Sequence, residues 1–222
     1  MLKSIIQEIY PLSQYNVILA NGQYPNNAYL TDIIFGAQTL ICCDGAINNL
    51  IRQQINPDYI IGDCDSISNE IKNAFQNKII VIADQNSNDL TKAVNLSEEL
   101  KLTDIVVLGA TGMREDHTLA NIGLLTTYAK QITNICLLSD YGIFTTHSGT
   151  ETVKTLVGQQ ISFFTDIPGT KISAPQLKWP LTNYKLEHRF SGTLNEATQN
   201  YLTITTSANV ILYRSFEIKM MN

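Results

Sequence analysis

The fold is decided by a short apolar stretch that ends in a carboxylate and a glycine: residues 39–45 read Thr-Leu-Ile-Cys-Cys-Asp-Gly. Residues 59–63, Tyr-Ile-Ile-Gly-Asp, repeat the pattern, and residues 17–22 read Val-Ile-Leu-Ala-Asn-Gly. Continuous apolar runs of this length, rich in β-branched residues, are typical of parallel strands covered on both faces. Further runs of this kind occupy residues 78–83, 104–109 and 134–139.

Amphipathic segments separate some of these runs. In residues 89–101 apolar side chains recur near helical spacing, with lysines and glutamates on the other side, and residues 116–130 follow the same period. Alternating strands and helices predict an α/β domain with a doubly wound, mostly parallel sheet. Ligands bind such sheets at the carboxyl ends of the strands.

The pattern changes after about residue 145, where no long helical period remains. Turn signals such as Ile-Pro-Gly at residues 167–169 separate short β-rich segments. These segments are residues 150–157, 160–164, 171–174, 183–190, 202–206 and 210–213. They predict an antiparallel sandwich or barrel. We therefore expect two domains, residues 1–143 and residues 144–222.

The composition excludes several classes of protein. The chain has 222 residues and a net charge of −5, and 44% of its residues are hydrophobic, which argues against disorder. It has no run of Lys and Arg, so we expect no nucleic-acid partner. No apolar run approaches the roughly 20 residues that span a bilayer, and the N-terminus lacks a signal-peptide pattern. Four cysteines without a C-x-x-C pair fit buried thiols in a reducing cytoplasm.

Carboxylates follow the apolar runs or open the helical segments. They are Asp44, Asp63, Asp65, Asp89 and Asp116. In a parallel sheet all five are expected along one rim, and Asp63 and Asp65, two residues apart in an extended segment, are expected to share a face. Alone, Asp89 and Asp116 are more often helix N-caps than ligands. Together the carboxylates repel one another unless a cation neutralises them, and hard oxygen ligands suit Mg²⁺.

The segment Gly-Ala-Thr-Gly at residues 109–112 follows a strand and precedes a helix. It predicts a phosphate loop, because backbone N–H groups at a helix start attract anions, although a plain βα turn has the same pattern. Arg114 favours the phosphate loop, since a guanidinium binds phosphate through two hydrogen bonds. Lys92 is either a second cation or part of a solvated helix face, and His117 is a candidate for lining the site.

Four motifs, in order and at sensible spacing, resemble the thiamine pyrophosphokinase family. They are Asp44-Gly45-Ala46 with Asn48, Pro57-Asp58 through Gly62-Asp63-Cys64-Asp65-Ser66, Asp84-Gln85-Asn86 through Asp89-Leu90-Thr91-Lys92, and residues 109–117. The resemblance is dense in the first two thirds of the chain. It implies a catalytic α/β domain that binds ATP and Mg²⁺, and a thiamine-binding β-sandwich. It also implies a homodimer with the thiamine site at the subunit junction.

The resemblance implies a transfer of the pyrophosphoryl group from ATP to thiamine, which gives thiamine diphosphate and AMP. Its implied metal ligands are Asp44, Asp63, Asp65 and Asp89, and its implied ATP and phosphate residues are Gln85, Lys92, Thr111, Arg114, Asp116 and His117. Asp65, Asp89 and Arg114 are the implied catalytic residues, with Asp65 or Asp89 accepting the hydroxyl proton. The implied thiamine-binding residues are Trp179, Thr193, Leu194 and Asn195.

One departure from the family, one alternative role and two rival functions stay open at this point. Leu194 stands where many family members have Ser, and Trp179 is equally compatible with a place in the sandwich core. One rival function is another Mg²⁺-dependent nucleotide phosphohydrolase on a similar sheet. The other is a non-catalytic sensor of thiamine or nucleotide, against which the full carboxylate set argues.

Overall fold

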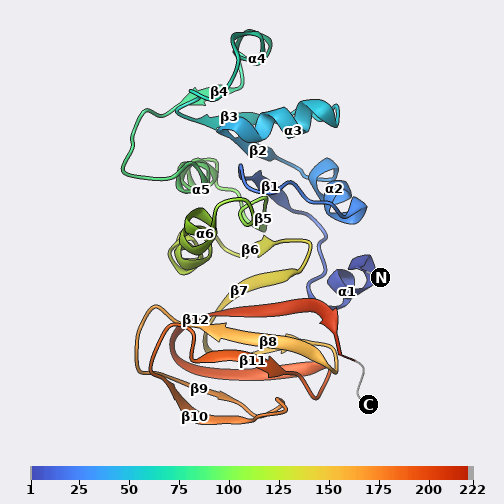
Figure 1. Ribbon diagram of the computed structural model, residues 1–222, viewed down its shortest axis with the longest axis vertical. Coiled ribbons are helices and arrows are strands. Elements are labelled where there is room, and N and C mark those ends of the chain that lie inside the picture. The colour runs from blue at the N-terminus through green and yellow to red at the C-terminus, as the bar shows by residue number, and fades with distance from the viewer. Residues whose placement is uncertain (1, 220–222) are drawn as a thin grey trace. The chain divides into compact units, whose positions relative to one another are not determined.

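The computed structural model describes residues 2–219, which form two compact units (Figure 1). One unit is Gln14–Ser139, and the other combines the chain from Asp140 onward with the residues up to Ser13. The apolar pattern does not reveal that the first residues group with the C-terminal strands. The division into functional domains at residue 143 stays a prediction.

The first unit contains a six-stranded sheet in the order β4-β3-β2-β1-β5-β6. Its strands are β1 (Asn16–Leu19), β2 (Leu40–Cys43), β3 (Tyr59–Gly62), β4 (Ile79–Val81), β5 (Ile105–Leu108) and β6 (Ile135–Leu138). Every pairing between them is parallel. All four residues of β1, β2, β5 and β6 are buried. Each apolar run is therefore a strand, and the predicted doubly wound parallel sheet is confirmed.

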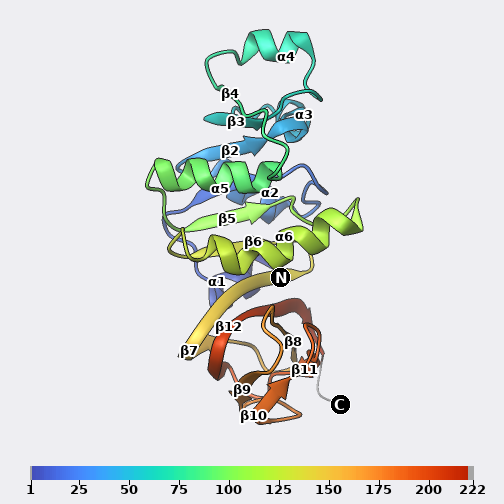
Figure 2. The same ribbon diagram turned by 90° about the vertical axis from the view of Figure 1, so that its left-hand side faces the viewer.

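Helices cover both faces of this sheet. They are α2 (Ala28–Phe35), the 3-10 turn η1 (Asp44–Ala46), α3 (Ile47–Arg52), α4 (Asn69–Ala74), α5 (Asp89–Glu99) and α6 (Glu115–Tyr128). Figures 1 and 2 show α5 and α6 on one face of the strands and α2 and α3 on the other. Burial on both faces is the reason why β1, β2, β5 and β6 carry continuous apolar runs instead of alternating ones.

The strand order reverses direction at β1. The chain proceeds from β1 through β2 and β3 to β4 on one side, and then returns to place β5 on the other side of β1. The helices that follow β1 and β5, α2 and α6, lie on opposite faces of the sheet. This reversal leaves a crevice at the carboxyl ends of the strands, which is where open α/β sheets bind ligands.

The second unit is antiparallel throughout its described strands. It contains α1 (Leu2–Ile9), β7 (Gly142–Lys154), β8 (Gln159–Phe164), β9 (Thr170–Ala174), β10 (Leu181–Leu186), β11 (Gly192–Glu196) and β12 (Tyr201–Ile218). The long strands β7 and β12 pair along most of their length, and β12 also pairs with β8 and β9 (Figure 2). A single apolar core draws on β8, β9, β10 and β12. The antiparallel C-terminal part is confirmed.

Several expected strand boundaries in this unit are wrong: the segment expected at residues 183–190 is β10, which ends at Leu186, and β11 was not expected. The segments expected at residues 202–206 and 210–213 are one strand, β12, because a register shift between Thr206 and Val210 absorbs the intervening residues. The strand expected at residue 150 begins at Gly142. Polar residues inside long, bulged strands interrupt the apolar pattern without ending the hydrogen-bonded ladder. None of the helices within residues 2–219 combines the length and apolar character needed to cross a membrane.

Candidate active site

A pocket of about 430 Å³ lies at the reversal of strand order in the first unit. Its wall includes the loop after β1, the loop after β5, and the first residues of α5 and α6. Of the residues predicted from the sequence, Asp63, Gln85, Asp89, Arg114 and His117 line it. The volume falls in the usual range for small-molecule sites, about 300 to 1,000 Å³.

Backbone hydrogen bonds join the loops after β1 and β5. Gly22 N donates to Gly109 O at 2.7 Å, and Gln23 N donates to Thr111 O at 2.9 Å. A Cβ atom on Gly22 would stand 2.7 Å from Thr111 O, closer than real Cβ contacts. Glycine at position 22 is therefore required by the close approach of the two loops. The loop after β5 is thus held as one wall of the pocket, with the Thr111 carbonyl engaged.

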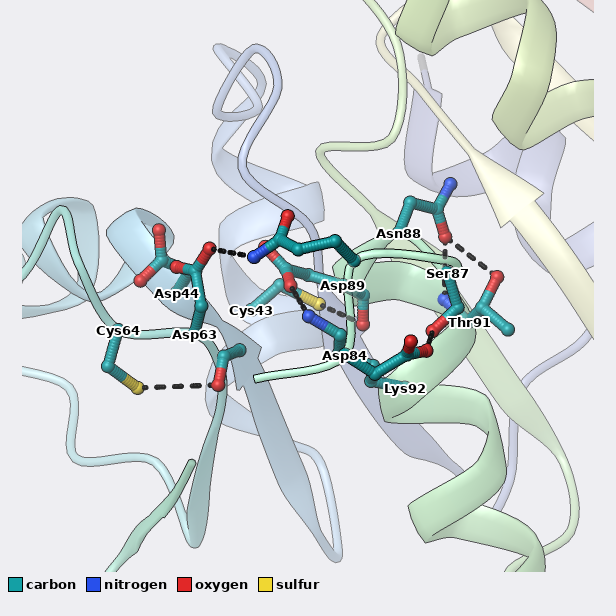
Figure 3. A network of polar contacts seen from close by, with 12 residues as sticks. Cys43, Asp44, Asp63, Cys64, Asp84, Ser87, Asn88, Asp89, Thr91 and Lys92 are labelled. Atoms are coloured by element: carbon teal, nitrogen blue, oxygen red, sulfur yellow. Dashed lines mark hydrogen bonds and ion pairs between the residues drawn. The ribbon is translucent and has the colours of Figure 1, made fainter. Parts of the chain in front are cut away.

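Asp44 follows β2 and is buried, with 8% of its surface exposed. Its Oδ2 atom accepts a hydrogen bond from Ser66 Oγ at 2.5 Å, whereas its Oδ1 atom has no hydrogen-bond partner among the described residues. Figure 3 shows Asp44, Asp63 and Asp89 as neighbours at the strand ends. Asp44 is not part of the pocket lining, but a buried carboxylate oxygen without a partner is costly, so Asp44 Oδ1 is available to a cation.

Asp63 and Asp65 do not share a face, contrary to the expectation from their spacing. Cys64 between them has a φ of 60°, so the segment is a turn and not an extended strand. The Asp65 N–H donates to Asp63 Oδ1 at 3.2 Å, and Gln85 Nε2 donates to Asp63 Oδ2 at 3.2 Å. These hydrogen bonds lower the pKa of Asp63. Asp63 is thus a fixed carboxylate in the pocket, while the Asp65 side chain is exposed and lies outside the lining.

Asp89 is the first residue of α5, but it does not cap the helix. Asn88 is the N-cap, and its side chain accepts a hydrogen bond from Thr91 N at 2.9 Å. Asp89 Oδ1 instead lies 3.0 Å from Lys92 Nζ, and the lysine side chain is only 4% exposed. The alternative role of Asp89 as the N-cap of the helix is therefore wrong. Asp89 instead lines the pocket. Lys92 lies outside the lining, so its contact with phosphate stays a prediction.

Arg114 and Asp116 form an exposed ion pair at the start of α6. The Arg114 guanidinium donates two hydrogen bonds to the Asp116 carboxylate, from Nε at 3.1 Å and from Nη2 at 2.5 Å. These hydrogen bonds lower the pKa of Asp116 and raise that of Arg114. Asp116 does not cap α6, whose N-cap is Arg114. Arg114 and His117 line the pocket, whereas Asp116 and Thr111 do not.

The carboxylates fit a divalent cation. A Cβ atom on Gly62 would stand 2.9 Å from Asp44 Cβ and 3.3 Å from Asp89 Oδ1, so the bare glycine lets these two side chains approach one another. The unpartnered Asp44 Oδ1 lies in the same place. Within residues 2–219, no three His, Cys, Asp or Glu side chains are placed as a complete metal site. Mg²⁺ usually binds one or two protein carboxylates, and substrate phosphates and waters complete its coordination.

The residues predicted for thiamine lie in the second unit. Asn195, which is buried, accepts a hydrogen bond from Trp179 N at 3.2 Å and donates one to Trp179 O at 2.8 Å. The Trp179 ring is 58% exposed, so the core alternative is wrong. Leu194 is 79% exposed with a φ of 64°, and Thr193 is exposed beside it. Asn195 thus fixes an exposed indole at the surface of this unit.

Several pocket residues were missed by sequence reasoning. Asn21 and Gly22 follow β1 directly, and the same position after an apolar run had marked Asp44 and Asp63 as candidates. Asn88 and Asn121 also line the pocket. Asn88 directly precedes the helical segment at residue 89, which is an N-cap signal, whereas no motif signal distinguishes Asn121. Cys43 also lines it, where burial raises the pKa of its thiol.

Comparisons with known proteins agree on one family. The model described as "Thiamin pyrophosphokinase, catalytic domain" matches residues 30–137, and "Thiamin pyrophosphokinase, substrate-binding domain" matches residues 142–213. Thiamine pyrophosphokinase 1 of Oryza sativa subsp. japonica is 28% identical over 229 residues, covering 89% of this chain and 85% of that protein. Thiamin pyrophosphokinase 1 of Caenorhabditis elegans is 28% identical, covering 84% and 81%.

Solved structures show the same fold. The thiamine pyrophosphokinase of Bacillus subtilis superposes with a TM-score of 0.77 at 24% identity, covering 92% of this chain and all of that one. The yeast thiamin pyrophosphokinase gives a TM-score of 0.76 at 20% identity, covering 94% and 89%. Both family models fall in the order that the two halves of the sequence predicted. The chain therefore belongs to the thiamin pyrophosphokinase family.

Proposed function

We propose that this protein transfers the pyrophosphoryl group of ATP to thiamine, giving thiamine diphosphate and AMP. The observation that carries the proposal is the pocket at the strand-order reversal, where carboxylates face a glycine-rich loop and an arginine. Family membership supports the same reaction. Phosphoryl transfer depends on positioning and charge neutralisation more than on covalent chemistry with the protein.

The proposed reaction is one displacement at phosphorus. The hydroxyl oxygen of thiamine bonds to the β-phosphorus of ATP, while the bond from that phosphorus to the oxygen bridging the α-phosphate breaks. AMP leaves with the bridging oxygen, and a carboxylate accepts the hydroxyl proton. Asp89 is the candidate acceptor, because it lines the pocket whereas the exposed Asp65 does not.

The residues proposed to bind ATP lie on the α5 and α6 side of the pocket. The Arg114 guanidinium and the N–H groups at the start of α6 are available to the phosphates. Arg114 can turn from Asp116 toward a phosphate at little cost, since 71% of its side chain is exposed. Gln85 and His117 complete this proposed phosphate wall.

The proposed cation is Mg²⁺, held by Asp44, Asp63 and Asp89, whereas Asp65, the fourth ligand expected from the sequence, is exposed outside the pocket lining. The unpartnered Asp44 oxygen supports this assignment. When bound, the cation would neutralise part of the polyphosphate charge. An acidic protein can then bind a polyanion, because the cation offsets the carboxylates.

Thiamine is proposed to bind at Trp179, Thr193, Leu194 and Asn195, with the site completed in a homodimer. Lys178 Nζ already lies 5.4 Å from the centre of the Trp179 ring, so this ring face accepts a cation. A cationic thiazolium is a suitable replacement for that ammonium group. All four cysteines are buried and none of them forms a disulfide, which supports the proposed cytoplasmic location.

One assay tests the function. The protein is incubated with ATP and MgCl₂, with and without thiamine, and AMP, phosphate and thiamine diphosphate are measured. Thiamine-dependent AMP in equal amount with thiamine diphosphate is expected. Phosphate release without thiamine would instead indicate a nucleotide phosphohydrolase. Binding of thiamine or ATP without any turnover would indicate a sensor and contradict the proposed enzyme.

A further inference from the structure

The Asn121 carboxamide on α6 joins two walls of the pocket. Its Nδ2 atom donates to Ala110 O, in the loop after β5, at 2.8 Å. Its Oδ1 atom accepts from Asn88 Nδ2, at the start of α5, at 3.0 Å. Asn121 is only 8% exposed. The carboxamide cannot flip without placing its oxygen against the Ala110 carbonyl, so both hydrogen bonds depend on asparagine in this orientation.

Asn88 connects Asn121 to the first turn of α5, which carries Asp89. Its Oδ1 atom accepts from Thr91 N at 2.9 Å and from Thr91 Oγ1 at 2.7 Å, so the side chain is held at both ends. Asn88 directly precedes Asp89, and both residues line the pocket. A shift of the Asn88 side chain therefore weakens the hydrogen bonds that hold the first turn of α5, which carries Asp89.

A second hydrogen bond ties the same turn to α6. Thr91 Oγ1 lies 2.8 Å from Tyr128 OH, and Tyr128 is only 1% exposed. Burial raises the pKa of Tyr128 to about 12, so the phenol stays protonated and able to donate. The first turn of α5 is thus fixed to α6 at two points, of which only Asn121 also holds the loop after β5.

We propose that Asn121 is a positioning residue for pyrophosphoryl transfer, which fixes the distance between the loop after β5 and Asp89 by hydrogen bonds to Ala110 in that loop and to Asn88 beside Asp89. The kinetic part of this inference rests on the proposed function. Asn121 acts through Asn88 and takes no part in bond making. Displacement of a catalytic group by about 1 Å can reduce a rate about 100-fold, so a hydrogen bond that sets this distance has a kinetic effect beyond its effect on stability.

A double-mutant cycle tests the coupling. Asn121→Ala removes both hydrogen bonds, and Asn88→Ser removes the Asn88–Asn121 bond but keeps a side chain of equal N-cap strength. We expect each single variant to lower kcat at saturating ATP and thiamine about 10- to 100-fold. The double variant should lose about as much kcat as the less active of the two single variants, because either substitution alone already breaks the Asn88–Asn121 bond. Losses that multiply, or a wild-type kcat in Asn121→Ala, would overturn the proposal.

Ser97→Ala serves as the matched control. Ser97 is fully buried on α5 and donates to Ala93 O at 2.8 Å, away from the pocket. Ser97→Ala should lower the melting temperature as Asn121→Ala does, but it should leave kcat unchanged. If kcat fell with melting temperature to the same degree in both variants, the role of Asn121 would be structural only, and the proposal would be wrong.

Amide hydrogen exchange separates this inference from the proposed function. The Thr91 and Lys92 amides donate to Asn88, to the side chain and the backbone carbonyl respectively. Both should exchange about tenfold faster in Asn121→Ala than in Ser97→Ala at matched stability, if the α6 contact holds this turn. This result would support the positioning even if the wild-type protein made no thiamine diphosphate. Equal exchange in the two variants would overturn it.

Discussion

Asp89 Oδ1 and Lys92 Nζ lie 3.0 Å apart on neighbouring turns of α5, with the lysine side chain 4% exposed and the aspartate side chain 32% exposed. The ammonium group therefore lies beneath the carboxylate, which faces the pocket. Since removing one partner of a buried pair leaves an uncompensated charge, each residue constrains the other. The contact that the structure shows for the Lys92 ammonium group is with Asp89, so Lys92 holds the Asp89 carboxylate in place.

Lys92→Met should keep the fold and lower activity. Methionine fills a similar volume and removes the buried ammonium group, and the Asp89 carboxylate left behind is 32% exposed and so stays hydrated, although it loses its only ionic partner among the described residues. We expect kcat to fall about 10- to 100-fold with little change in melting temperature. Lys101→Met, at an exposed lysine after the same helix, is the control. A wild-type kcat in Lys92→Met would contradict this role.

Asp63→Asn and Asp65→Asn should differ in effect. Asp63 lines the pocket, so loss of its charge should lower kcat by about 100-fold or more, as for other groups that stabilise charge in a transition state. Asp65 is exposed outside the lining and contributes its backbone N–H, which the substitution retains. We expect a loss of less than about tenfold there. Steady-state kinetics over a MgCl₂ titration measure both. An equal loss in the two variants would show that Asp65 also binds the cation.

His147 should make the second unit less stable at acid pH. It is 9% exposed on β7, with Nδ1 2.8 Å from Glu151 Oε2 and Nε2 2.8 Å from Thr145 Oγ1. Burial, together with the charge of Arg214, lowers the pKa of His147 although Glu151 opposes the shift. The unfolded chain then binds a proton more readily, so stability is present above the ordinary pKa of 6.5 and is lost as pH falls below it. Glu151 acts in the same direction at lower pH, because hydrogen bonds from His147 and Ser148 lower its pKa despite partial burial.

Melting temperatures between pH 8 and pH 5.5 test this prediction. His147→Gln should melt a few degrees lower at pH 8, since it loses hydrogen bonds worth about 1 kcal/mol each. Its melting temperature should then fall less than that of the wild type on acidification. His188→Gln, at an exposed histidine, should follow the wild-type curve. Parallel curves for His147→Gln and the wild type would refute the assignment.

Trp179→Ala should affect thiamine and not ATP. Without the exposed indole, thiamine loses a cation–π contact worth about 0.5 to 2 kcal/mol. This loss corresponds to an increase in KM for thiamine of roughly 2- to 30-fold. KM for ATP should stay unchanged, because the proposed ATP residues lie in the other unit. Tyr201→Ala, at another exposed aromatic of the same unit, is the control. An unchanged KM for thiamine would remove Trp179 from the proposed site.

Local patterns predicted the strands well and the candidate site in part. Residues 39–45 and 59–63 can be recognised as strands from consecutive residues alone, because burial on both faces requires apolar residues at every position of a central strand. The turn at Cys64 and the bulge after Thr206 have no such signature. Asn121 was missed for a related reason: its partners Asn88 and Ala110 are distant in sequence, and neither bond follows a periodic pattern.

The sequence by itself determined the parallel α/β arrangement, the antiparallel C-terminal strands, and the family motifs with their carboxylates, since all of these depend on neighbouring residues and short spacings. Only the tertiary structure decided which carboxylates converge. Asp44 and Asp89 approach one another beside Gly62, and Asp63 lines the same pocket as Asp89, because β2, β3 and α5 end or begin at one edge of the sheet, whereas the left-handed Cys64 turns Asp65 outward. It also decided that Lys92 is buried beneath Asp89, because packing of α5 against the sheet selects which face of the helix is covered.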